Sequence, residues 1–74
     1  MTRYQNLGGN SNVWGYDTGA DWIAVQFNDG ATYTYTDVSA GVGNISQMKA
    51  LAARGYGLNG FINTHVRKMY ASRR

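Results

Sequence analysis

Three short runs of β-type residues lie so close together that they fix how the chain can pair with itself. The runs cover residues 13–16, 22–27 and 32–36, and turn residues separate them, first Asp17 to Asp21 and then Asn28 to Gly30. Parallel strands need crossover connections of a dozen or more residues, and these connections are far shorter. The sequence therefore predicts a three-stranded antiparallel meander.

The length of the second turn decides which aromatic side chains are buried. A two-residue turn would place three threonines on the apolar face of the preceding run and expose two tyrosines. A three-residue loop that ends at a left-handed Gly30 pairs Val25 with Tyr33 and turns Tyr35 to the same face. Because burying hydroxyl groups in place of aromatic rings is unfavourable, we predict the three-residue loop. Trp22 and the threonines then lie on the outer face.

The pattern changes to helical spacing after the third run. A first helix is predicted from near Asn44, where an Asn with a Gln three residues later resembles a capping box, to a stop at Gly55 or Gly57. A second helix is predicted to start near Asn59, a good N-cap residue, and to carry an apolar stripe as far as Tyr70. The predicted fold class is α+β, a three-stranded antiparallel β-meander followed by two α-helices packed on one face (β-β-β-α-α).

Length and composition leave room for one domain and favour a non-enzymatic protein. Among the 74 residues, 1–12 are rich in Gly and Asn and predict a flexible arm, 13–70 predict the domain, and 71–74 predict a basic tail. The chain has no Cys, which excludes disulfides and thiolate chemistry, and four Asp are its only carboxylate side chains. No run approaches the roughly 18 apolar residues of a membrane span, so we expect a cytoplasmic protein without a membrane partner.

The single histidine gives little support to a catalytic or metal site. His65 falls on the apolar stripe of the predicted second helix, so we expect it at the edge of the core. Without Cys, Glu or a second His, a metal site would need Asp ligands gathered from separate turns, and we expect no metal and no cofactor. The Asp residues are expected to cap backbone amides in those turns.

Charge is strongly segregated along the chain. Residues 1–48 carry all four Asp and one Arg, whereas residues 49–74 carry six Lys and Arg side chains and no acid. If the two parts fold to different faces, the molecule has an acidic and a basic pole. The basic third favours a polyanionic partner, although the last two arginines also suit a solubilising tail.

Several short motifs occur in an order and spacing typical of one family. They are Gly15-Tyr16-Asp17, the hairpin Ile23-x-Val25-x-Phe27-x-x-Gly30, Tyr33-Thr34-Tyr35 with Val38 after it, and Ala53-Arg54-Gly55 followed by Leu58-Asn59 and Ile62. Over about residues 11–70 the chain resembles the KTSC domain, a module found at the C-terminus of some lysyl-tRNA synthetases and as stand-alone bacterial and phage proteins. The resemblance implies the same α+β fold, and its synthetase context implies RNA binding. Ser39 departs from the Pro usual at that position.

Cationic and aromatic residues form the strongest candidate binding set. Phosphates are bound by cations gathered on one surface, and bases stack on flat rings. Tyr33 and Tyr35 are expected to act mainly as core residues. Trp22 could equally make a dimer contact or cover a sheet edge. The candidate binding residues are Arg54, Arg67, Lys68, Arg73, Arg74, Trp22, Tyr33, Tyr35 and Asn59.

Three hypotheses about function follow. The first is a non-enzymatic module that binds nucleic acid, RNA or other single strands, through the basic C-terminal third with help from exposed aromatics. The second is a phage-type anti-defence protein that sequesters an anionic nucleotide as a homo-oligomer, because a monomer of this size has little room for an enclosed pocket. The third is a protein that inhibits a host protein by direct contact. The last two place the chain in the host cytoplasm.

Overall fold

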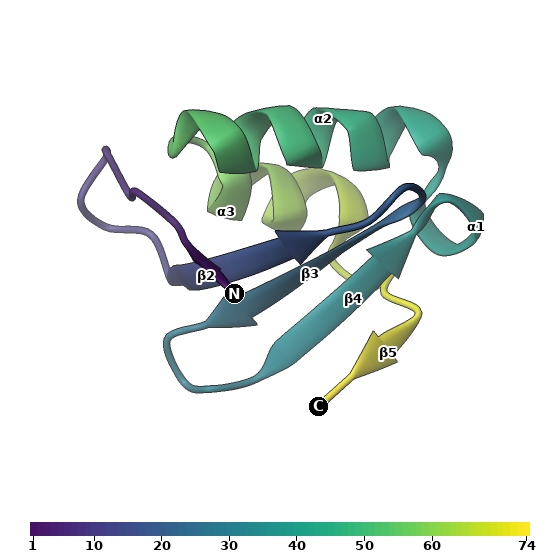
Figure 1. Cartoon of the computed structure of the whole chain (residues 1–74), viewed down its shortest axis with the longest axis horizontal. Helices are drawn as coiled ribbons and strands as arrows, with labels where there is room; N and C mark the ends of the chain where they lie inside the picture. Colours follow the sequence, from purple (N-terminus) through teal and green to yellow (C-terminus); the bar gives the residue numbers. More distant parts are fainter.

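The computed structural model describes residues 1–74 and contains one five-stranded antiparallel sheet with α2, α3 and η1 on one of its faces (Figure 1). The strands lie in the sheet in their sequence order, β1-β2-β3-β4-β5. The α+β class is confirmed, whereas the prediction of three strands is incomplete. The elements are β1 (Thr2–Arg3), β2 (Val13–Thr18), β3 (Trp22–Phe27), β4 (Thr32–Thr36), α1 (Asp37–Ala40), α2 (Val42–Arg54), α3 (Leu58–Phe61), the π-type turn η1 (Ile62–Val66) and β5 (Ser72–Arg73).

The hairpin between β3 and β4 has the predicted three-residue loop. Val25 pairs with Tyr33, and Gly30 has a φ of 93°, in the left-handed region that glycine enters without a Cβ penalty. Tyr35 therefore lies on the helix side of the sheet and is only 1% exposed. Trp22 lies on the opposite face beside the threonines of β4, as predicted.

The predicted arm, residues 1–12, begins with a short edge strand. β1 pairs with β2, and the Tyr4 side chain that follows it is only 3% exposed. The Tyr4 hydroxyl accepts a hydrogen bond from the backbone N–H of Leu58 at 3.3 Å. The Leu7 N–H donates to the Gly55 carbonyl at 2.8 Å. The N-terminal segment is thus tied to the junction between α2 and α3.

The predicted basic tail is the opposite edge strand. β5 pairs with β4, with Arg73 opposite Tyr33, and Arg74 exchanges two backbone hydrogen bonds with Thr32 at 2.8 and 2.9 Å. Because successive side chains of a strand point to opposite faces, Arg73 lies on the helix side and Arg74 on the outer side. The two terminal arginines therefore cannot serve one surface.

Helix α2 starts earlier than predicted because a short helix precedes it. Thr36 and Ser39 form a capping box at α1, in which each hydroxyl accepts the other residue's backbone N–H at 3.0 Å. α2 then begins at Val42, and the Asn44 side chain donates to a carbonyl of α1 instead of capping the helix. The helix ends at the left-handed Gly55, one of the two predicted stops.

The second helical segment is shorter than predicted. α3 begins at Leu58, so Asn59 lies inside the helix instead of capping it, and the segment ends with η1 at Val66. Met69 and Tyr70, predicted on its apolar stripe, are 45% and 37% exposed. The chain leaves the helix here because it must return to the free edge of β4 to form β5. No helix combines the length and the apolar character that crossing a membrane requires.

One hydrophobic cluster joins the sheet to the helices. It takes alternate residues from β3 and β4, the buried stripe of α2, and apolar residues four apart from α3 and η1. Tyr4 completes it from beyond the end of β1. The cluster consists of Tyr4, Val13, Ile23, Val25, Tyr35, Ala40, Ile45, Met48, Leu51, Ala52, Leu58, Ile62 and Val66.

The turn after α2 supplies a test of this packing. Gly55 has a φ of 75°, and a Cβ added there would lie 2.5 Å from the Cβ of Gln5. Gly55→Ala should therefore lower the free energy of unfolding by about 1–3 kcal/mol. Gly43→Ala is the matched control, because Gly43 is helical with open space around it, and this change should raise stability by about 0.5–1 kcal/mol. Urea unfolding measures the stability of both variants. Equal stabilities of the Gly55→Ala and Gly43→Ala variants would contradict the packing of Gln5 on this turn.

Candidate nucleotide-binding pocket

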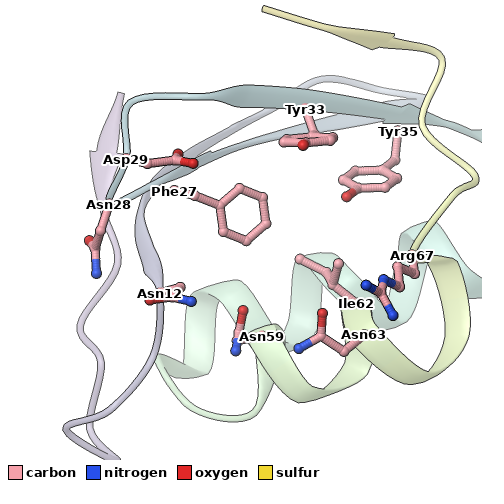
Figure 2. Close-up of a pocket in the computed structure, with 10 residues that line it drawn as sticks. All are labelled: Asn12, Phe27, Asn28, Asp29, Tyr33, Tyr35, Asn59, Ile62, Asn63 and Arg67. Carbon is pink, nitrogen blue, oxygen red and sulfur yellow. The ribbon is translucent and has the colours of Figure 1, made fainter.

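A pocket opens on the helix side of the sheet, between the ends of β3 and β4 and the α3–η1 segment (Figure 2). Its volume is about 340 Å³, which is within the range of small-molecule sites. We call it the aromatic–amide pocket, because amide and aromatic side chains make up most of its wall. Its lining residues are Asn12, Phe27, Asn28, Asp29, Tyr33, Tyr35, Asn59, Ile62, Asn63 and Arg67.

The helical wall is built by a regular row of polar side chains. Asn59, Asn63 and Arg67 are spaced four residues apart, so they share one face of the α3–η1 segment, and all three line the pocket. The buried side chains Ile62 and Val66 anchor this segment to the core. Each amide offers both a donor and an acceptor, and the guanidinium offers several donors and a positive charge.

The sheet wall is aromatic. The Phe27 ring projects into the pocket (Figure 2) and meets the Tyr33 ring edge to face, with centroids 5.4 Å apart. Tyr33 makes a second edge-to-face contact with Tyr70 at 4.9 Å. The Tyr35 ring is packed in the core, but its hydroxyl points into the pocket (Figure 2). These contacts hold the rings in fixed positions.

Charge is distributed unevenly along the pocket. Arg67 and Asp29 lie at opposite ends of it (Figure 2), and the Asp29 carboxylate accepts a turn N–H at 3.0 Å. The Arg73 guanidinium lies over the Tyr33 ring, 5.3 Å from its centroid. The one ion pair in the structure joins the N-terminal ammonium to Asp17 at 3.9 Å. Arg67 is therefore not neutralised by a carboxylate.

The pocket brings together about half of the residues predicted from the sequence. Tyr33, Tyr35, Asn59 and Arg67 line it, and Arg73 lies against Tyr33. The common feature of these five residues is their position on the helix side of the sheet or on the segment that covers it.

The other predicted residues lie elsewhere. Trp22 and Arg74 line a hollow of about 600 Å³ on the outer face of the sheet. Arg54 lies at the end of α2 over the Tyr56 ring, 5.6 Å from its centroid. Lys68 is exposed just beyond η1. The predicted set therefore does not form one continuous surface.

Two further expectations from the sequence are wrong. The acidic and basic residues do not separate into poles, because Asp29 shares the aromatic–amide pocket with Arg67 and Asp17 shares the outer hollow with Arg74. His65 is exposed rather than at the core edge. It stacks on Phe61 with ring centroids 4.3 Å apart. The predicted apolar stripe does not continue through His65, because the π-type turn replaces the regular helix there.

Sequence reasoning missed several residues of the pocket. Phe27, Asn12, Asn28 and Asn63 line the pocket but were not among the candidate binding residues. One signal could have identified the helical wall, namely the four-residue spacing of Asn59, Asn63 and Arg67. The loop asparagines carry no such signal, because only the fold brings them to the pocket.

Comparison with known proteins gives no further guide to the pocket. No family model, no curated protein and no solved structure matches this chain. The resemblance to the KTSC domain therefore stays a prediction carried by the motifs of the sequence.

Tyr35 is the one group whose protonation the fold changes clearly. Desolvation by burial raises the pKa of Tyr35 from 10.0 to about 12, and the neighbouring Tyr33 and Tyr70 add to the effect. The hydroxyl therefore stays protonated at neutral pH and presents a neutral hydrogen-bonding group to the pocket.

Alkaline titration tests this environment. Below pH 10 Tyr35 is protonated in both the folded and the unfolded chain, so its contribution to stability is then fully present. Between pH 10 and about 12 the unfolded chain loses this proton while the folded chain keeps it, so stability falls as the pH rises. Absorbance titration should show a late-ionising tyrosine that disappears in Tyr35→Phe, and this variant should lose stability less steeply over the same interval. A Tyr35 that ionises near pH 10 would contradict the buried environment.

Proposed function

We propose that the protein is a non-enzymatic module that binds single-stranded nucleic acid, above all RNA, with one base held in the aromatic–amide pocket. The observation that carries the proposal is the presence in one pocket of an aromatic ring, two amides and an arginine without a carboxylate partner. These groups are Phe27, Asn59, Asn63 and Arg67.

Each part of the pocket suits one part of a nucleotide. A base can stack on the Phe27 ring, as bases do in proteins that bind single strands. Asn59 and Asn63 present donor and acceptor pairs that match the edge of an unpaired base. The volume of about 340 Å³ suits one nucleoside rather than a duplex.

The charges favour one orientation of the nucleotide. Asp29 would repel a phosphate at its own end of the pocket, whereas Arg67 at the other end would bind one. Arg73, on the Tyr33 side, adds a second guanidinium on the same face, and Lys68 follows Arg67 in sequence. We therefore place the phosphate at the Arg67 end and the base between Phe27 and the amides.

A second candidate function uses the same pocket. The pocket lies within one chain, so a free anionic nucleotide could be sequestered there without an oligomer. This is the anti-defence alternative in its simplest form. It differs from strand binding in the number of phosphates contacted, and hence in the dependence of affinity on salt.

The salt dependence of binding tests the proposal. For about three phosphate contacts, one for each cation on this face, the affinity for a single-stranded oligoribonucleotide should fall with a log–log slope near −2. Arg67→Ala combined with Lys68→Ala should flatten the slope to about −0.7, because two of those contacts are lost. Fluorescence anisotropy between 50 and 300 mM salt would measure these slopes.

A control variant removes one positive charge outside the pocket. Arg3 lies over the Trp14 ring, 4.8 Å from its centroid, and lines none of the three pockets. Arg3→Ala should therefore leave the slope unchanged. A strand that does not bind, or a slope that both variants flatten equally, would refute binding at this pocket. Tight binding of a mononucleotide with a slope near zero would favour sequestration instead.

A further inference from the structure

A second pocket adjoins the aromatic–amide pocket at its Asn59 wall. It lies between the N-terminal loop and the turn from α2 to α3, has a volume of about 310 Å³, and is lined by Asn6, Gly8, Asn10 and Tyr56 among others. We call it the N-terminal pocket. This pocket was not predicted from the sequence, because residues 1–12 were expected to form a flexible arm.

The two pockets have one lining residue in common. Asn59 lines both of them, and the chain passes from one to the other between Ser11, in the N-terminal pocket, and Asn12, in the aromatic–amide pocket. A ligand that fills the first pocket therefore has the second directly beside it.

The N-terminal pocket repeats the chemistry of its neighbour. Tyr56 presents a ring that is 54% exposed, and the Arg54 guanidinium lies 5.6 Å from the ring centroid. Asn6 and Asn10 supply amides. An aromatic ring and amides thus line the pocket on each side of Asn59, and an arginine lines the aromatic–amide pocket alone.

We infer that the two pockets are adjacent subsites for consecutive nucleotides, so that the ligand is a single-stranded step of two bases joined by a phosphodiester. This inference rests on the proposed function and specifies its ligand. The first base stacks on Phe27 and the second on Tyr56. A mononucleotide occupies only half of the site.

The placement of charge agrees with this arrangement. Arg67 lines the aromatic–amide pocket, Arg54 lies over the Tyr56 ring beside the N-terminal pocket without lining it, and the shared Asn59 is uncharged. The phosphate on the outer side of the first nucleotide then meets the Arg67 guanidinium, and the linking phosphodiester meets an amide donor.

The experiment compares ligands of increasing length by calorimetry, using the full chain with AMP, the dinucleotide pApA and a four-nucleotide adenylate strand. The second base should strengthen binding about 5- to 150-fold over AMP. Tyr56→Ala should abolish that gain and leave the AMP affinity unchanged. Phe27→Leu should weaken all three ligands, and Trp14→Ala, which removes an exposed ring outside both pockets, should change nothing.

The outcomes distinguish a failure of the second subsite from a failure of the proposed function. Equal affinities for AMP and pApA, both reduced by Phe27→Leu, would overturn the second subsite but leave the first. A gain from the second base that survives Tyr56→Ala would also overturn it. No binding of any of the ligands would refute the proposed function itself. If the four-nucleotide strand binds at least as tightly as pApA, the site holds an internal step of a strand. If the four-nucleotide strand binds more weakly than pApA, the site holds a free dinucleotide.

Discussion

The register of the β3–β4 hairpin is the constraint on which the pocket depends. Gly30 takes a left-handed conformation at the end of a three-residue loop, and the pairing of Val25 with Tyr33 follows from it. A shift by one residue would turn Tyr33 and Tyr35 to the outer face and put threonines in their place. The sheet wall of the aromatic–amide pocket would then lose two of its three rings.

The rest of the pocket depends on how the helical segment is held against that wall. Tyr4 links the N-terminal segment to the first residue of α3 through its hydroxyl, and Ile62 and Val66 anchor α3 and η1 in the core. Asn59, Asn63 and Arg67 consequently face the sheet. Asn59 and Asn63 sit on these helical elements, so little backbone freedom remains to be lost there when a ligand binds.

The sequence was sufficient for the parts of the fold that repeat a local pattern. The three central strands, the hairpin register and the stop at Gly55 each depend on periodicity or turn chemistry over several neighbouring residues. β1 and β5 have two residues each, which is too short for an alternating pattern, and their pairing depends on contacts across the whole chain. Only part of the candidate site was predicted, because the rest depends on contacts between distant parts of the chain. Arg67 and the tyrosines stood out by type, whereas Asn12 and Asn28 reach the pocket only through the fold.

The most direct test of the account is an NMR titration of the labelled protein with a short single-stranded RNA. The account predicts that the side-chain amide signals of Asn59 and Asn63 and the guanidinium signal of Arg67 shift first and saturate together. The indole signal of Trp22, on the outer face of the sheet, should stay in place. Shifts confined to Trp22 and the outer threonines, with the Asn59 and Asn63 amides unmoved, would contradict the assignment of the binding site to the aromatic–amide pocket.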